Sequence, residues 1–164
     1  MYEKFGQFID GKWSPSSNKE TYEVINPATE EVLGNASKAT PADVDRALKS
    51  AEKGLAIWRK TPPWQRAYTL RKIADMVREK KDVLAKWMTL ENGKPLAEGV
   101  GETNGAADIF EWNAEETKRI FGQTIESRFE DTRVHVYYQP VGVVAALSPW
   151  NFPLILAASK ISTA

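Results

Sequence analysis

Cysteine is absent from this chain of 164 residues. Its absence excludes disulfide bridges, thiolate metal sites and thiol catalysis within these residues. Histidine occurs once, at His135. A single imidazole without companion ligands does not indicate a metal site or a general base. We therefore expect no metal site, and we expect His135 to occupy an exposed strand position.

A net charge is also absent, because Lys plus Arg and Asp plus Glu each number 22. No overall field attracts nucleic acid or an anionic membrane, so neither is expected as a partner. The sequence has no apolar run of membrane-spanning length, and Met1 to Asp10 lacks the basic-then-apolar plan of a secretory signal. The sequence thus predicts a globular, cytoplasmic protein.

Short strands are expected in the first forty residues. Phe8 to Trp13 places apolar residues on both sides of Asp10-Gly11, a pair that favours a tight hairpin. Residues 22–26 alternate between apolar and polar, and residues 31–37 indicate a further strand.

Helices are expected to follow. Thr40 is a candidate cap, with Asp43 in the first turn to interact with the helix dipole. Pro62-Pro63 indicates the start of a second helix, and Asn92-Gly93 before a proline indicates the end of a third. A fourth helix, over about residues 96–121, is interrupted by three glycines: Gly99, Gly101 and Gly105. Each glycine costs about 1 kcal/mol relative to alanine, so we expect either close packing or a bend there.

The last part of the chain predicts an α/β fold. Residues 123–129 and 133–138 alternate as two strands of a hairpin. Residues 141–147 form a continuous apolar run, which is typical of a strand covered on both faces in a parallel sheet. A turn and a helix from residue 154 onward follow. One strand and one unfinished helix cannot bury both faces of a doubly wound sheet, so we expect a truncated unit.

We divide the chain into three parts. Residues 1–121 hold the N-terminal strands and helices, residues 122–139 the hairpin, and residues 140–164 the parallel strand, its loop and an incomplete helix.

Several motifs resemble the aldehyde dehydrogenase superfamily in order and approximate spacing. They are Phe8 to Trp13, Asn26 to Thr29, Asp43 to Ala47, Glu91 to Pro95, and Pro140 to Val143 leading into Pro149-Trp150-Asn151-Phe152-Pro153. The Pro-Trp-Asn-Phe-Pro element is the most specific of them. The overall character is similar to succinate-semialdehyde dehydrogenases.

The resemblance implies the N-terminal part of an aldehyde dehydrogenase fold, with an oligomerisation hairpin and the start of a Rossmann-like cofactor domain. It implies oxidation of an aldehyde to a carboxylic acid with NAD or NADP, through a thiohemiacetal on a cysteine that this chain lacks. The 164 residues alone are then expected to be inactive. A noncatalytic interaction or assembly fragment that uses the hairpin is the alternative.

The resemblance also implies roles for individual residues. Asn151 is the implied catalytic residue, which donates a side-chain N–H to the oxyanion. Such a donor is typically worth ~2.7–4 kcal/mol. On the residues alone, a helix cap or a turn remains open for Asn151.

Cofactor binding is implied for Leu147, Ser148, Pro149 and Trp150, because dinucleotides bind beyond the carboxyl ends of the strands in such sheets. The alternative for Trp150 is a core aromatic. No Gly-x-Gly-x-x-Gly motif follows residues 141–147.

Substrate binding is implied for Phe152, beside a tunnel along which the helix around Gly105 would run; ordinary packing is the alternative for both. Lys160 matches a lysine linked to proton relay, or else it is simply solvated. Ser159 stands where some succinate-semialdehyde dehydrogenases carry an arginine, which puts that substrate in doubt. Residues 123–138 imply a homo-oligomer, a dimer or tetramer, formed by pairing of free strand edges.

Overall fold

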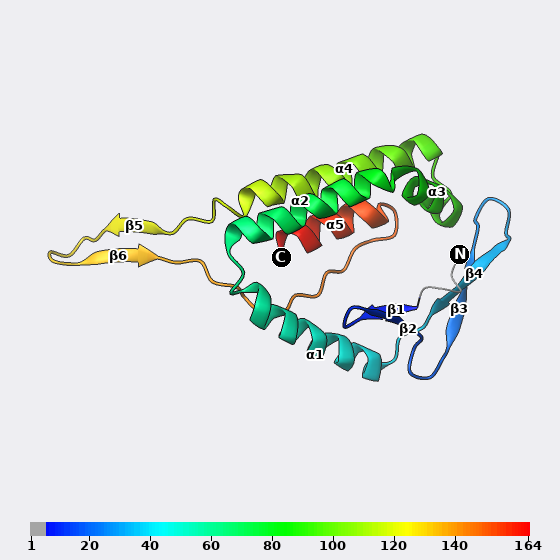
Figure 1. The fold of residues 1–164 in the computed structure, drawn as a ribbon, viewed down its shortest axis with the longest axis horizontal. Coiled ribbons are helices and arrows are strands. Elements are labelled where there is room, and N and C mark those ends of the chain that lie inside the picture. Colours follow the sequence, from blue (N-terminus) through cyan, green and yellow to red (C-terminus); the bar gives the residue numbers. More distant parts are fainter. Residues whose placement is uncertain (1–5) are drawn as a thin grey trace.

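The computed structural model describes residues 6–164, which form five helices and three separate two-stranded antiparallel sheets (Figure 1). In chain order the elements are β1 (Gln7–Ile9), β2 (Lys12–Ser14), β3 (Thr21–Ile25), β4 (Val32–Ser37), α1 (Pro41–Trp58), α2 (Pro63–Glu79), α3 (Lys81–Asn92), α4 (Leu96–Glu116), β5 (Gln123–Glu126), β6 (Arg133–Val136) and α5 (Pro153–Thr163). This mixture of helices and strands confirms the predicted fold class.

The first hairpin forms as the sequence predicts. Phe8 of β1 lies opposite Trp13 of β2, with their rings 5.1 Å apart. Asp10 and Gly11 both take positive φ angles, 55° and 74°, as a tight hairpin turn requires. The second sheet pairs β3 with β4.

The start of α1 is fixed by the capping residues that the sequence identifies. Thr40 accepts a hydrogen bond from the backbone N–H of Asp43, and the Asp43 carboxylate accepts one from the backbone N–H of Thr40 at 2.9 Å. The backbone N–H of Ser17, 3.2 Å away, and the Arg46 guanidinium, 2.7 Å away, also donate to Asp43. The carboxylate therefore joins the loop after β2 to the helix.

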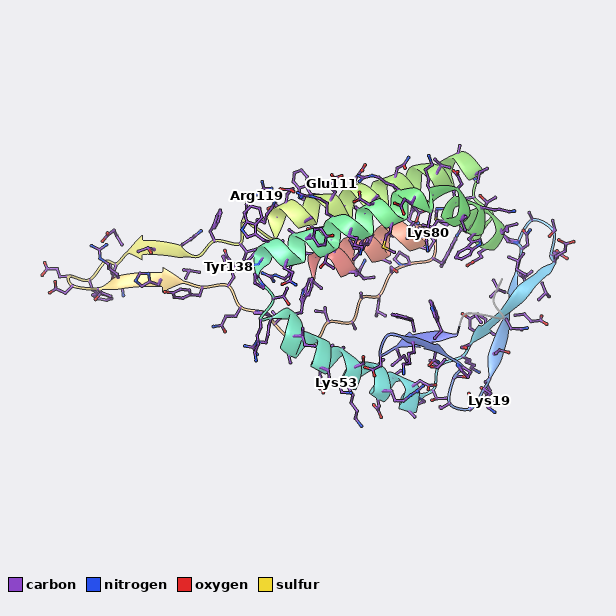
Figure 2. All side chains as sticks on the ribbon, in the orientation of Figure 1. Lys19, Lys53, Lys80, Glu111, Arg119 and Tyr138 are labelled. Atoms are coloured by element: carbon purple, nitrogen blue, oxygen red, sulfur yellow. The ribbon has the colours of Figure 1, made fainter. Side chains whose placement is uncertain are left out.

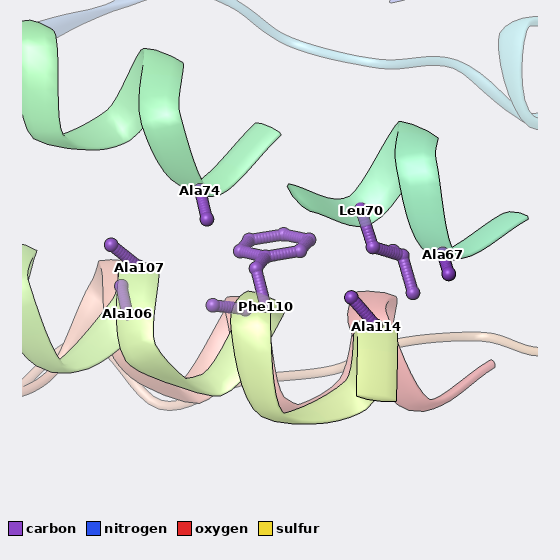
Figure 3. Close-up of a cluster of buried hydrophobic side chains, with 8 residues drawn as sticks. Ala67, Leu70, Ala74, Ala106, Ala107, Phe110 and Ala114 are labelled. Atoms are coloured by element: carbon purple, nitrogen blue, oxygen red, sulfur yellow. The ribbon is translucent and has the colours of Figure 1, made fainter. Parts of the chain in front are cut away.

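The core lies between α2, α4 and α5 (Figure 3). Phe110 of α4 and Leu70 of α2 are its large buried members, and the other buried residues are alanines: Ala67, Ala74, Ala106, Ala107, Ala114 and Ala158. The small alanine side chains allow the helix backbones to approach closely. The space that remains between the helices is filled mainly by Phe110 and Leu70.

Close packing explains two of the three glycines in α4. A Cβ on Gly99 would lie 3.0 Å from the backbone oxygen of Ala85 in α3. A Cβ on Gly105 would lie 2.8 Å from Cδ1 of Ile155 in α5, whereas one on Gly101 would meet nothing within 4 Å. The helix ends at Glu116, earlier than the expected residue 121.

The expected strand over residues 141–147 is not formed, which corrects the sequence prediction. The segment runs from the hairpin to α5 without strand pairing, between α1 and the helical layer (Figure 1). Val141 is 96% exposed and Leu147 is 82% exposed. A parallel strand needs neighbours on its edges. Within residues 6–164 every strand pairs only inside its own hairpin, so no such neighbour is available.

The third hairpin, β5 with β6, projects away from the helices (Figure 1). Tyr138 lies at its base, beside the helical layer (Figure 2). The strands are shorter than the expected ranges of 123–129 and 133–138, and Asp131 in the connecting turn has a φ of 56°. In the described part of the chain, no helix has the length and apolar character needed to cross a membrane.

Truncation of the central aromatic should destabilise the helical layer. Phe110→Ala leaves a cavity between α2 and α4, and such a change typically costs ~3–5 kcal/mol. Trp112→Ala, on the same helix but 68% exposed, should stay within about 0.5 kcal/mol of the parent. Urea unfolding followed by circular dichroism measures both, and equal losses would contradict this account of the core.

Low pH should weaken the hydrogen bonds through which Asp43 joins α1 to the loop after β2. The pKa of the Asp43 carboxyl lies below its usual value of 3.8, chiefly because the backbone N–H of Thr40 donates to it. Ser17 and Arg46 lower this pKa further, while burial opposes them. A group with a lowered folded-state pKa stabilises the fold above its unfolded pKa, and this stabilisation disappears as the pH falls.

We therefore expect Asp43→Asn to lower the urea midpoint at about pH 7, with a smaller difference from the parent at about pH 3. Asp45→Asn, an exposed change on the same helix, is the matched control. A difference that does not depend on pH would be inconsistent with the role assigned to Asp43.

Candidate functional site

The loop over residues 148–153 turns the chain from the extended segment into α5. Side chains from the end of α3 and from the α3–α4 connection hold its backbone. Asn92, at the end of α3, donates from Nδ2 to the backbone oxygen of Trp150 at 3.0 Å. Lys94 donates from Nζ to the backbone oxygen of Asn151 at 2.9 Å. Two consecutive carbonyl groups of the loop are thus bound by side chains more than fifty residues earlier in the sequence.

The turn that carries Asn92 and Lys94 is itself well defined. Gly93 caps α3 in the left-handed conformation, with φ 80° and ψ 6°, which confirms the predicted helix end. A Cβ on Gly93 would lie 3.0 Å from Cγ of Pro27. The Asn26-Pro27 motif therefore contacts the motif around Gly93.

Glu102 of α4 binds the other side of the loop. Its Oε1 accepts hydrogen bonds from the backbone N–H groups of Leu154, at 2.8 Å, and Ile155, at 3.2 Å. Pro153 occupies the first position of α5 and has no N–H, so these two are the first free donors of the helix. A carboxylate at this end also interacts favourably with the helix dipole.

Lys94 and Glu102 form an ion pair beneath the loop. Their side chains are only 6% and 0% exposed, and Lys94 Nζ contacts Glu102 Oε2. Lys94 Nζ also lies 4.4 Å from the ring centroid of Phe152, a cation–π contact. The ammonium and the carboxylate neutralise one another's charge. Their other hydrogen bonds go to the Asn151 oxygen and to the N–H groups of Leu154 and Ile155.

The Asn151 side chain is exposed. The residue that caps α5 is Phe152, which makes no capping hydrogen bond from its side chain, so the cap alternative for Asn151 gains no support. Within residues 6–164, Asn151 is bound through its backbone oxygen, which accepts from Lys94 Nζ. The arrangement therefore leaves the amide available as a donor. Its oxyanion role remains a prediction.

The four residues expected to bind the cofactor lie together at the end of the extended segment. Leu147, Ser148, Pro149 and Trp150 are all exposed. Trp150 is 78% exposed, contrary to the core alternative, and lines a groove of about 710 Å³ with residues that include Trp87, Pro153 and Leu154. Cofactor contact by these residues remains a prediction.

The residues associated with the substrate by resemblance are only partly brought together. Phe152 is 46% exposed beside Lys94, and Gly105 contacts Ile155 at the start of α5. Ser159 and Lys160 both donate to the backbone oxygen of Leu156, at 2.9 and 3.4 Å, within their own helix.

His135 lies exposed on β6, as expected, and its Nδ1 is 3.1 Å from Thr124 Oγ1 across the hairpin. A search of the described residues finds no group of three His, Cys, Asp or Glu side chains arranged to hold a metal ion.

Sequence reasoning missed the supporting roles of Asn92, Lys94 and Glu102. One signal was present: Glu102 falls at helical spacing between Gly99 and Ala106, on the buried side of α4. A carboxylate on a buried helix face requires a charged or hydrogen-bonding partner.

Comparison with known proteins identifies the family to which the chain is similar. Residues 13–164 match the model of the aldehyde dehydrogenase family. A glutarate-semialdehyde dehydrogenase of Pseudomonas aeruginosa is 44% identical over 157 residues, which cover 96% of this chain and 32% of that protein. A succinate-semialdehyde dehydrogenase of Escherichia coli, named for NADP(+), is 42% identical over 95% of this chain and 32% of its own length.

Solved structures give the same result. An Escherichia coli NADP-dependent enzyme superposes with a TM-score of 0.88 at 43% identity, over 92% of this chain and 31% of the other. A betaine aldehyde dehydrogenase of Staphylococcus aureus, in complex with NAD+, superposes with a TM-score of 0.91 at 34% identity, over 97% of this chain and 33% of the other.

The chain spans about a third of the length of the curated relatives that it matches. The matched region includes the Pro-Trp-Asn-Phe-Pro loop and the side chains that hold it. With a family model matched over nearly all of its residues, this chain belongs to the aldehyde dehydrogenase family.

Proposed function

We propose that this chain forms the first third of an NAD(P)-dependent enzyme that oxidises an aldehyde to a carboxylic acid, with Asn151 as an oxyanion donor. The observation that carries the proposal is the loop itself. Its backbone is bound by Asn92 and Lys94, and Glu102 binds the start of the helix that follows. The Asn151 side chain is exposed and can donate.

The chemistry explains why such a donor is needed. Attack of a thiolate on an aldehyde forms a C–S bond and moves the carbonyl electron pair onto oxygen. In the proposal the thiolate belongs to a cysteine outside this chain, because the chain has none. An N–H of the Asn151 amide donates to the developing negative charge. A donor on a fixed backbone stabilises that charge without reorganising at the moment of reaction.

NAD or NADP is the proposed cofactor, which accepts hydride when it is bound. Leu147, Ser148, Pro149 and Trp150 are the residues proposed to contact it. They are contiguous, exposed and mostly apolar, a combination that suits the face of a nucleotide ring or ribose. Relatives of both cofactor types support the proposal, since one is named for NADP(+) and another holds NAD+.

The proposed substrate is an aldehyde that reaches the loop beside Phe152. Two relatives are named for semialdehydes, glutarate semialdehyde and succinate semialdehyde. Both compounds carry a carboxylate at the end opposite the aldehyde. They are therefore the first substrates to assay.

A second candidate function is assembly. The β5–β6 hairpin projects from the helices and presents free strand edges (Figure 1). Free edges can pair with another sheet through main-chain hydrogen bonds. We propose that residues 123–138 join copies of the protein into a dimer or tetramer, and that this is the whole activity if the chain acts alone.

The Asn151 amide provides the direct test of the catalytic proposal. In the complete polypeptide containing this chain, we expect NAD(P)H formation from a semialdehyde, and Asn151→Ala should lower kcat by ~10²–10³-fold. Stopped-flow absorbance at the nicotinamide band measures the chemical step. Asn35→Ala, an exposed change on β4, should leave kcat unchanged.

The 164 residues alone should form no NAD(P)H, since they lack the nucleophile. Undiminished turnover by Asn151→Ala with chemistry rate-limiting would remove the oxyanion role. Absence of turnover in the complete polypeptide with either cofactor would leave only the assembly candidate.

Assembly has its own test. Gln123 pairs with Val136, so these two residues lie side by side and residues 124–135 between them can be replaced by a short Gly-Asn turn. We expect this deletion to convert the oligomer to a monomer without loss of helical circular dichroism. Light scattering coupled to size-exclusion chromatography measures the mass, and an unchanged oligomer would exclude the hairpin as the contact.

A further inference from the structure

The ion pair of Lys94 and Glu102 lies in the interior of the protein and not at its surface. Glu102 has no exposed side-chain area and Lys94 has 6%. Taking two charges out of water is costly, and apolar residues of similar volume often stabilise a fold equally well or better. The position of such a pair therefore calls for an explanation beyond stability.

Every further contact of the pair is to the loop or the helix that follows it. Glu102 Oε1 binds the N–H groups of Leu154 and Ile155. Lys94 Nζ binds the Asn151 oxygen and lies against the Phe152 ring. The contacts fall on both sides of Pro153, so they bracket the bend at which the chain enters α5.

The geometry limits how the Asn151 side chain can be displaced. Its carbonyl carbon is held through the oxygen that Lys94 binds, at 2.9 Å. The preceding carbonyl, that of Trp150, is held by Asn92 at 3.0 Å. The peptide groups before and after the Asn151 Cα are therefore both fixed, which leaves only its side-chain torsions to vary.

We propose that Lys94 and Glu102 are a positioning pair that sets the direction of the Asn151 amide; this inference rests on the proposed function. Glu102 fixes the start of α5 by its two helix N–H groups, and Lys94 transmits that position to the Asn151 carbonyl. Neither residue touches the reacting atoms. They act through Asn151, whose amide must meet the oxyanion at hydrogen-bond distance.

Helix packing supplies the rest of the support. Glu102 lies on the same face of α4 as Gly99 and Gly105, where the backbone approaches α3 and α5. The close approach at Gly105 places Ile155 directly against α4. Because this approach is close, the Glu102 carboxylate can reach the first N–H groups of α5 without an intervening water.

The test is a double-mutant cycle in the complete enzyme. Glu102→Gln retains an oxygen that can accept from the helix N–H groups but removes the negative charge that holds Lys94. We expect kcat to fall about tenfold or more, while the KM for the aldehyde changes by less than about twofold. In an Asn151→Ala background the same change should alter kcat by less than about twofold, because the group that it positions is already gone.

A purely structural role predicts a different result. Loss of folded enzyme would lower kcat by the same factor in both backgrounds, and this outcome would overturn the proposal. Glu111→Gln is the matched control, because it removes the same charge from the same helix, where Glu111 pairs with Arg78. Figure 2 labels Glu111 on α4. The control variant should leave kcat and KM unchanged.

If Glu102→Gln does not fold, the neutral pair Glu102→Gln with Lys94→Met replaces it. This variant leaves no unpaired buried charge, keeps an acceptor for Leu154 and Ile155, and removes the donor to the Asn151 oxygen. The same non-additive fall in kcat is expected. Full activity of the neutral pair would overturn the proposal.

The cycle also separates the two proposals. If Asn151→Ala alone leaves kcat unchanged, the proposed function fails and the positioning role fails with it. If Asn151→Ala lowers kcat but Glu102→Gln acts equally in both backgrounds, only the positioning role fails.

Discussion

One buried ion pair connects α4 and the turn before it to α5, which follows about fifty residues later in the sequence. Lys94 follows α3, Glu102 lies within α4, and the groups that they bind belong to α5 and the loop before it. Without Glu102, the N–H groups of Leu154 and Ile155 at the start of α5 would lose their hydrogen-bond acceptor. The pair thus contacts the chain on both sides of Pro153, at the Asn151 oxygen and at the N–H groups of Leu154 and Ile155.

Elements controlled by neighbouring residues were predictable from the sequence. Thr40 and Asp43 cap α1, Asp10-Gly11 forms the first turn, and Gly93 ends α3, in each case because the determining contacts lie within a few residues. The glycines of α4 indicated close packing but not which helices would approach. Gly99 meets α3 and Gly105 meets α5, and a pattern within one helix cannot identify its neighbours.

Elements controlled by distant residues were not predictable. The apolar run over 141–147 has the composition of a buried parallel strand, yet pairing depends on neighbours that residues 6–164 do not provide. The candidate site shows the same division. Asn151 was identified through a specific local motif, whereas Glu102 was missed because its partners, Leu154 and Ile155, are 52 and 53 residues away.

The alanine-rich layer has a consequence for how the protein tolerates change. Ala106, Ala107 and Ala158 are at most 2% exposed between the helices. A larger side chain at one of them would have to be accommodated by a shift of the neighbouring helix. Because α5 begins at Pro153, directly after the loop, a shift of this helix would move Asn151 as well. Substitutions that enlarge these alanines are therefore expected to alter the position of Asn151, although the alanines lie in the hydrophobic interior.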